Sequence, residues 1–279
     1  MIALLEPIFQ GPLAMHGEKL ACSASPPPAA IPVVQLLDGS PALERLVHRY
    51  ARHWRCTGPD LRAAASAWSM AYFDALLPPV CAAATLLHHV FPLRARDVAV
   101  IVNDEGAAQS FHIRDPGAPR HGAAPLERYE SLVWDHLDPL FHSLQALTRL
   151  PRKILWSNCA RHLEAIFDVA RSLAAGNAAI DNDRRVLLND ATWPDRQPGG
   201  AQCPNPFFGR ERVILLAEAG RPAPHRLHRQ CCLYYKLPGV DYCGACPLDP
   251  RHRGQPSEDR APELIAADGE RDELYDPGS

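Results

Sequence analysis

The chain has 279 residues, of which 47% are hydrophobic and 22% are charged, and its formal net charge is -3. These values argue against a disordered or fibrous protein, and the length allows a buried core without disulfides. Because the charge balance offers no excess of positive groups to a phosphate backbone, nucleic acid is not expected as a principal partner.

The cysteines and the first residues indicate a reducing compartment. Five of the nine cysteines are scattered singly and four crowd into 16 residues, which is not the pattern of a disulfide framework. The first twenty residues include Glu6 and lack the apolar run of a secretory signal. We therefore expect a cytoplasmic protein. Peripheral contact with the cytoplasmic face of the inner membrane is left open, although no basic amphipathic helix demands it.

The N-terminal part changes character near residue 40. Residues 1–40 are dense in proline, which disfavours both continuous helix and central strand, so we expect an extended leader there. Ser40 and Pro41 then supply a helix cap and a first helical position. Apolar residues at helical spacing follow and predict a helix over 41–54.

The next stretch is strongly apolar. A helix is predicted from Asp60 to a stop at Pro78, and another over 80–90. Within 63–93 the only formally charged residue is Asp74, and at about 20 residues per span the stretch is long enough to cross a bilayer. The proline break and the cost of that charge in hydrocarbon argue against crossing. We interpret the stretch as two buried helices and expect no transmembrane span.

The remaining elements follow from periodicity. A β-hairpin is predicted over 98–114, where β-branched and alternating residues flank turn residues. Helical spacing of apolar residues predicts three further helices, one from Leu132 up to a stop at Pro151, one over 157–175 and one over 179–190. An apolar run at 212–216 predicts a strand or short helix, and beyond Pro250 the chain is too polar to order itself.

Together these elements predict an α+β fold with a mainly helical body, a β-hairpin and a small C-terminal subdomain that carries clustered cysteines. We expect four parts along the chain. They are a proline-rich extended leader over 1–40, the helical body over 41–210, a cysteine-bearing subdomain over 211–250 and a polar flexible tail over 251–279.

Two cysteine pairs separated by ten residues are the most informative feature of the sequence. They are Cys231 with Cys232, and Cys243 with Cys246. Four thiolates that converge on one point need a cationic metal to offset their charge. Four is the ligand count of both a structural zinc site and a 2Fe-2S cluster, so the count alone leaves both open.

The spacing of the pairs favours the cluster without excluding zinc. Cys243 and Cys246 form the C-x2-C turn that structural zinc sites use. Adjacent residues such as Cys231 and Cys232 have Cα atoms about 3.8 Å apart and point to opposite faces when extended. A two-iron cluster has four separate terminal positions and accepts such a pair more readily than one tetrahedral ion does.

The chain resembles the FhuF-like ferric siderophore reductases, whose C-terminal motif has the same arrangement of adjacent cysteines, ten residues and C-x2-C. The match includes neighbours of the cysteines, namely Arg229, Leu233, Tyr234 and Pro247-Leu248. Upstream stretches occur in the family's order, namely Trp68, Tyr72-Phe73, Leu76-Leu77-Pro78-Pro79, Leu155-Trp156-Ser157-Asn158 and Pro204-Asn205-Pro206-Phe207. The resemblance covers roughly residues 40–250.

The resemblance implies one 2Fe-2S cluster on the four cysteines and reduction of a ferric siderophore, with no catalytic residues beyond the cluster. One added electron gives a ferrous ion, for which the hard oxygens of a siderophore are poorer ligands. The sequence contains neither a G-x-G-x-x-G nor a G-x4-G-K-[ST] motif, so no nicotinamide or ATP site is indicated. We therefore expect an external electron donor, either a protein or a small reductant.

Five further residues are candidates for substrate contacts: Arg229, Lys236, Trp156, Asn158 and Arg161. Arg229 and Lys236 lie beside the cysteines and can donate charge-assisted hydrogen bonds to an anionic chelate or to cluster sulfurs. At the predicted helix start, Asn158 has capping as its alternative role. Two other functions stay open: a zinc-stabilised binding protein, and a siderophore-binding or electron-relay protein without catalytic turnover.

Overall fold

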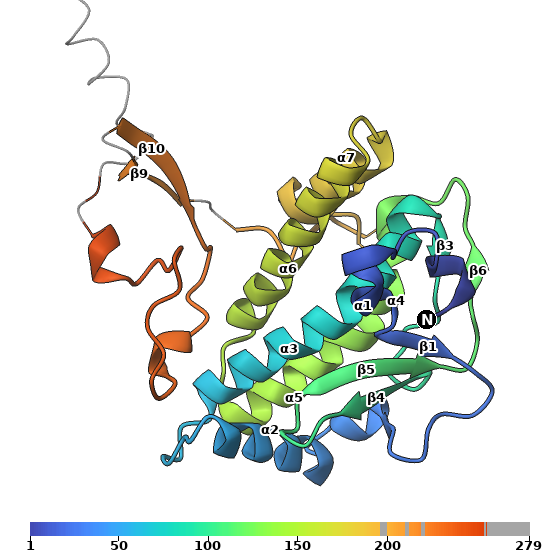
Figure 1. Ribbon diagram of the computed structural model, residues 1–279, viewed down its shortest axis with the longest axis horizontal. Coiled ribbons are helices and arrows are strands. Elements are labelled where there is room, and N and C mark those ends of the chain that lie inside the picture. The colour runs from blue at the N-terminus through green and yellow to red at the C-terminus, as the bar shows by residue number, and fades with distance from the viewer. Residues whose placement is uncertain (196–199, 210–211, 219–220, 254, 256–279) are drawn as a thin grey trace, which may run out of the picture. The chain divides into compact units, whose positions relative to one another are not determined.

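The computed structural model describes residues 1–195, 200–209, 212–218, 221–253 and 255 (Figure 1). The chain divides into two units. The first comprises Met1–Gly209 and Cys232–Asp241, and the second comprises Arg210–Cys231 and Tyr242–Ser279. The division therefore runs through the peptide bond between Cys231 and Cys232.

The first unit is mainly helical. Its longest described helices, α3 (Arg62–Cys81) and α6 (Arg152–Leu173), pack against each other. The other α-helices described there are α1 (Ala14–Gly17), α2 (Pro41–His53), α4 (Pro125–Leu132), α5 (Asp138–Thr148) and α7 (Ala178–Arg184). π-Helical turns follow α3, α4 and α7 at Ala82–Leu86, Val133–Leu137 and Arg185–Asn189. Short 3₁₀ turns occupy Ala3–Leu5, Gly11–Leu13, Val33–Leu36 and Tyr234–Lys236.

The main sheet of the first unit has, within the described residues, four strands in the order β1-β5-β4-β2. They are β1 (Leu20–Cys22), β5 (Ala108–Ile113), β4 (Val98–Val102) and β2 (Ile31–Pro32). β1 is parallel to β5 and the other neighbours are antiparallel. β4 and β5 confirm the hairpin predicted over 98–114, and α3 packs on β5 (Figure 1).

Short strand pairs complete the described sheets of the first unit. They are β3 (His89–Val90) with β6 (Ala118–Pro119), and β7 (Thr192–Trp193) with β8 (Cys203–Pro204). The combination of helices and small sheets confirms the predicted α+β class. The helix predicted over 41–54 is also confirmed, as α2. Its predicted cap is present too, since the Ser40 Oγ accepts a hydrogen bond from the Ala42 amide at 3.1 Å.

The predicted helix stop at Pro78 is wrong. α3 continues through Pro78 and Pro79 to Cys81, and a π-helical turn and strand β3 occupy the place of the helix predicted over 80–90. A proline inside a helix costs about 3 kcal/mol or more. The largest side chains of α3 are fully buried, namely Trp68, Tyr72 and Phe73. Since burial of one such side chain contributes about 1.5–3 kcal/mol, core packing outweighs the proline cost.

The N-terminal residues differ from the predicted extended leader. Their apolar side chains belong to the core, because Leu5, Leu20, Val33 and Leu36 are fully buried. Proline density does exclude a long helix here, but it permits short 3₁₀ turns and edge strands. Pro32 lies on β2, which is an edge strand of the sheet. Residues 1–40 thus form an integral part of the first unit.

The apolar helix of the first unit passes the length and composition test for a membrane span. This stretch, Arg62–Leu86, has 72% of its apolar window buried inside the structure. Core helices of folded domains have the same composition and the same burial. The burial of α3 therefore agrees with the interpretation of this stretch as core.

Three predicted helices have shifted bounds. The helix predicted from Leu132 to a stop at Pro151 is divided by a π-helical turn, begins earlier, at Pro125, and ends at Thr148. The helix predicted over 157–175 begins at Arg152, and the one predicted over 179–190 ends in a π-helical turn. A π-helical turn is wider than an α-helical one and breaks the 3.6-residue period, and helix ends carry little apolar spacing signal, so the period alone could not place these bounds.

The second unit is built around a β-hairpin. β9 (Arg212–Glu218) pairs antiparallel with β10 (Arg221–Leu227), which confirms a strand at the run predicted over 212–216. A 3₁₀ turn at Pro250–His252 follows the second cysteine pair. Of the tail predicted over 251–279, residues 254 and 256–279 lie outside the described residues.

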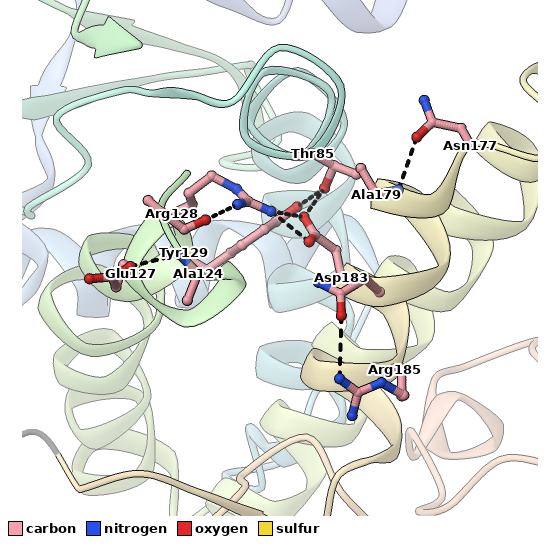
Figure 2. A network of polar contacts seen from close by, with 11 residues as sticks. Thr85, Ala124, Glu127, Arg128, Tyr129, Asn177, Ala179, Asp183 and Arg185 are labelled. Atoms are coloured by element: carbon pink, nitrogen blue, oxygen red, sulfur yellow. Dashed lines mark hydrogen bonds and ion pairs between the residues drawn. The ribbon is translucent and has the colours of Figure 1, made fainter. Parts of the chain in front are cut away.

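A buried ion pair joins distant helices of the first unit (Figure 2). The Arg128 Nη2 on α4 donates to both carboxylate oxygens of Asp183 on α7, at 2.6 and 2.7 Å. The Thr85 hydroxyl donates to the same carboxylate at 2.8 Å and lies 2.7 Å from the Tyr129 hydroxyl. The side chains of Arg128 and Asp183 are 4% and 0% exposed, so each charge depends on its partner.

We predict that Asp183→Ala lowers the free energy of unfolding by about 3–5 kcal/mol, because it leaves the Arg128 charge buried and unpaired. The matched control is Asp181→Ala on the same helix, whose ion pair with Arg171 is more than half exposed. The control should lose less than about 1 kcal/mol. Urea unfolding measures both values, and equal losses would contradict the importance of the buried pair.

Candidate metal centre

Two of the four predicted ligands lie close together in the second unit. The Sγ atoms of Cys231 and Cys246 are 3.6 Å apart, and the two residues are 8% and 1% exposed. Both cysteines are free thiols rather than a disulfide. The residue that follows β10 contributes to this approach, because the His228 amide donates to the Ala245 carbonyl at 2.9 Å. Residues far apart in the sequence are thereby held side by side.

The distance between these two sulfurs fits ligands of one metal ion. Thiolates on a tetrahedral ion with metal–sulfur bonds of about 2.3 Å lie about 3.8 Å apart. A disulfide would require about 2.05 Å. The observed 3.6 Å therefore suits metal ligation, and it suits iron and zinc equally.

The C-x2-C turn of the second unit is held by its own backbone and by histidines. The Cys246 amide donates to the Cys243 carbonyl at 2.9 Å, which closes the turn. The His252 Nδ1 donates to the Cys246 carbonyl at 2.9 Å, and the His225 Nε2 donates to the Gly244 carbonyl at 3.1 Å. No motif in the sequence singles out either histidine, although each lies within about twenty residues of the pair.

Asp249 follows the last cysteine and is held both by its backbone and by its side chain. The Asp249 amide donates to the Cys246 carbonyl at 3.2 Å. Hydrogen bonds from Arg251 lower the pKa of the Asp249 carboxyl to about 2. The carboxylate is therefore ionised at neutral pH and remains paired with Arg251, at 2.6 Å.

Cys232 belongs to the first unit and is anchored there. It is 2% exposed, and its carbonyl oxygen accepts a hydrogen bond from the Ser66 hydroxyl of α3 at 2.7 Å. The next residue, Leu233, has a φ of 63°. A non-glycine residue in this left-handed region costs about 1–2 kcal/mol, so the reversal of the chain after Cys232 is imposed by its surroundings.

The segment after Leu233 packs on the helices of the first unit. The 3₁₀ turn Tyr234–Lys236 contacts α3, and the Tyr234 ring meets Trp54 edge-on at a centroid distance of 6.3 Å. Lys236 is exposed, and Arg229 of the second unit is half-buried. Both predicted substrate contacts thus keep some access to solvent.

The structure brings Asn158 and Arg161 together on α6. The Arg161 Nη2 donates to the Asn158 Oδ1 at 2.9 Å, and the Asn158 Nδ2 donates to the Ser66 Oγ, also at 2.9 Å. Asn158 is fully buried and lies inside the helix rather than at its cap. The Asn158 side chain therefore forms its observed hydrogen bonds with other residues of the first unit. The sequence pattern does not single out Ser66, although it lies between alanines near the start of an alanine-rich helix.

Trp156 lies apart from this group, in an aromatic cluster of the core. It is 5% exposed, and its ring meets Phe141 and Phe207 edge-on at centroid distances of 4.6 and 5.2 Å. The substrate contacts predicted for Trp156, Asn158 and Arg161 stay predictions. Among the described residues, no three histidine, cysteine, aspartate or glutamate side chains are close enough to hold a metal ion. Within the second unit, the structure brings the thiols of Cys231 and Cys246 together.

A separate cavity of about 520 Å³ lies between the N-terminal residues, α3 and α6. Its lining is mostly apolar, with His16, Asp74 and His162 among the polar groups. Burial lowers the pKa of His162, so this imidazole is neutral near pH 7. None of the predicted site residues lines the cavity.

Comparison with known families gives two matches in this chain. The family model described as "Ferric iron reductase FhuF-like transporter" matches residues 66–220. The model described as "FhuF 2Fe-2S C-terminal domain" matches residues 229–248, the segment that contains all four cysteines. The two matches together include most of α3, all of α6 and the cysteine motif.

Individual relatives agree with these matches. The chain is similar to the ferric siderophore reductase of Escherichia coli (strain K12), with 24% identity over 186 residues. The similarity covers 66% of this chain and 64% of that protein, which is less than two thirds of the relative. Among solved structures, the chain is similar to the aerobactin synthetase IucA from a hypervirulent pathotype of Klebsiella pneumoniae. That likeness has a TM-score of 0.50 at 17% identity and covers 64% of this chain and 38% of that one, so it concerns the fold alone.

We predict that mild oxidation of metal-free protein with diamide joins Cys231 to Cys246, because their sulfurs are already 3.6 Å apart. Tryptic peptides 230–236 and 237–251 should then migrate as one disulfide-linked species in mass spectrometry. Cys246→Ser should abolish the link. A product with Cys243 joined to Cys246 and Cys231 still open to alkylation would contradict this arrangement.

Proposed function

This chain belongs to the FhuF-like ferric iron reductase family, and from that premise we propose that it reduces the ferric ion of a siderophore complex. In this proposal single electrons pass through one 2Fe-2S cluster held by the four C-terminal cysteines, and ferrous iron is released. The cysteines are Cys231, Cys232, Cys243 and Cys246. The chain matches only part of its curated relative, so activity, substrate and partners belong to the proposal.

The observation that carries the proposal is the pairing of motif and geometry in one short segment. The 2Fe-2S domain of the family matches residues 229–248. Within that segment the first and last cysteines approach to 3.6 Å, a distance that suits two thiolates on one metal ion. Three of the four cysteines are buried, which limits water and oxygen at the sulfurs. Cys243 is half-buried and is the more accessible position.

For this chemistry the protein has to hold the cluster and shield it from water and oxygen. A 2Fe-2S cluster, when bound, supplies one-electron reduction and oxidation. One electron converts the ferric ion of the substrate into a ferrous ion, for which hydroxamate, catecholate or carboxylate oxygens are poorer ligands. Reduction therefore weakens the chelate and frees the metal. An external donor, either a protein or a small reductant, loses the electron.

The remaining parts of the proposal concern place and recognition. The scattered, unlinked cysteines support a reducing cytoplasm as the place of reaction. Peripheral contact with the cytoplasmic face of the inner membrane belongs to the same proposal. Arg229 and Lys236 are the cations nearest the cysteines in sequence and would attract an anionic chelate.

One alternative has direct support from the geometry. The separation of 3.6 Å between the Cys231 and Cys246 sulfurs also suits zinc, which would make the cysteines a structural tie in a binding protein. A second alternative keeps the cluster but limits the chain to binding a siderophore or relaying electrons. Metal content distinguishes the first alternative, and repeated turnover distinguishes the second.

We predict that anaerobically purified protein contains about two iron and two sulfide per chain, with the visible absorption and reduced-state paramagnetic signal of a 2Fe-2S cluster. Serine at Cys231, Cys232, Cys243 or Cys246 should lower the iron and sulfide content, because each change removes a thiolate ligand. The control is Cys56→Ser, which alters a half-buried thiol outside the motif and should retain the cluster. Colourless protein with one zinc per chain would end the reductase proposal.

We predict that wild-type protein with excess dithionite and a ferric siderophore releases many equivalents of ferrous iron per chain. A colorimetric ferrous chelator follows the release. Cys243→Ser should fall to the rate of the protein-free control, because it lacks one cluster ligand. A release that stops after one equivalent would favour the relay or binding alternative instead.

A further inference from the structure

A buried hydrogen-bond chain connects helices α3 and α6 of the first unit to Cys232. We propose that Ser66 and Asn158 are positioning residues that hold this cysteine and bias the cluster toward its reduced state. The inference rests on the proposed function, because it takes Cys232 as a cluster ligand. It assigns roles to two residues that would not themselves touch the metal.

Three contacts form the chain. The Arg161 Nη2 donates to the Asn158 Oδ1 at 2.9 Å, and the Asn158 Nδ2 donates to the Ser66 Oγ at 2.9 Å. The Ser66 hydroxyl then reaches the Cys232 carbonyl oxygen at 2.7 Å. All these residues belong to the first unit, so the contacts lie within one unit.

The chemistry of the groups fixes the direction of every bond. A guanidinium only donates, so the Asn158 Oδ1 must accept and its Nδ2 must donate. The Ser66 oxygen accepts that bond, which leaves its single hydrogen for the Cys232 carbonyl, a group that only accepts. The positive end of each dipole therefore points toward Cys232, with the Arg161 cation at the far end.

Ser66 does not behave as a serine inside a helix ordinarily does. Such a hydroxyl usually bonds to a carbonyl one turn earlier in its own helix. Ser69 follows that rule, since it donates to the Ser66 carbonyl at 2.7 Å. Ser66 instead bonds to a residue 166 positions away. Ser66 and Asn158 are both fully buried, so water does not compete for these bonds.

The backbone beside the anchored carbonyl explains why an anchor is needed. Leu233 follows Cys232 directly and adopts a left-handed conformation with a φ of 63°. Side chains other than glycine rarely stay in this region unless their surroundings hold them. The bond from Ser66 fixes the carbonyl just before this residue and so stabilises the turn. Without this hydrogen bond, Cys232 and Leu233 can leave this conformation together.

Two measurable consequences follow from the geometry. Reduction adds negative charge to the cluster, and positive dipole ends near a ligand stabilise that charge. Loss of the Ser66 hydroxyl should therefore shift the midpoint potential to a more negative value. In metal-free protein the same loss should let Cys232 open more often, so its thiol should react faster with an alkylating reagent.

The test compares three variants of the full-length chain. Ser66→Ala removes the donor to Cys232. Ser69→Ala is the matched control, because it deletes a buried hydroxyl on the same helix that bonds only within that helix. Asn158→Asp serves if Ser66→Ala does not fold. An aspartate keeps the contact with Arg161 but cannot donate to Ser66, so the serine hydroxyl turns away from Cys232.

Iodoacetamide labelling of metal-free protein, read by tandem mass spectrometry of peptide 230–236, gives the first result. Ser66→Ala and Asn158→Asp should raise the labelling rate of Cys232 about two- to tenfold over wild type, the range that follows from one lost hydrogen bond. Ser69→Ala should leave the rate unchanged. Cys231 in the same peptide is the internal reference.

Potentiometric titration with paramagnetic detection gives the second result, with Ser66→Ala compared with Ser69→Ala. Asn158→Asp is left out here because its added charge would itself move the potential. A negative shift and altered g-values in Ser66→Ala alone support the inference. Identical potentials and labelling rates in both serine variants would overturn it while the proposed function stands. A wild-type protein that binds no iron-sulfur cluster would overturn both.

Discussion

Mutual repulsion of thiolates is the constraint on which the rest of this structure depends. Four cysteines within one short segment can be ionised together only around a cation, and burial makes the requirement stricter because water no longer screens the charges. The 3.6 Å distance between the Cys231 and Cys246 sulfurs therefore fits two thiolates that share one cation. Around it, the carbonyl of Cys246 accepts bonds from His252 and from the Asp249 amide. These contacts involve the backbone of the segment rather than its thiols, which the proposed cluster would use as ligands.

The support for Cys232 comes from a different part of the chain. Helices α3 and α6 are held by ordinary core packing, yet a chain of hydrogen bonds crosses their interface and ends on the carbonyl of this cysteine. A buried polar group is costly unless fully bonded, and here Ser66 and Asn158 satisfy each other. The helical body is thus more than a scaffold, because its packing sets the position of one predicted ligand.

The sequence predicts those features whose signal is local. The cysteine spacing, the hairpin at β4 and β5 and the cap of α2 at Ser40 each depend on neighbouring residues, and each can be read directly. The course of α3 through Pro78 could not be read, because core burial overrides the local preference of proline. The role of Ser66 depends on a contact across 166 positions. No periodicity or spacing rule reports such a contact.

The most direct test is a single-turnover experiment. Protein reduced by one electron per chain is mixed anaerobically with a ferric siderophore, and the cluster absorption and a ferrous chelator are followed in the same stopped-flow cell. The account predicts that the oxidised absorption returns at the same rate as ferrous iron appears, with one ferrous ion for each reduced cluster. A cluster that stays reduced in the presence of the ferric complex would contradict it.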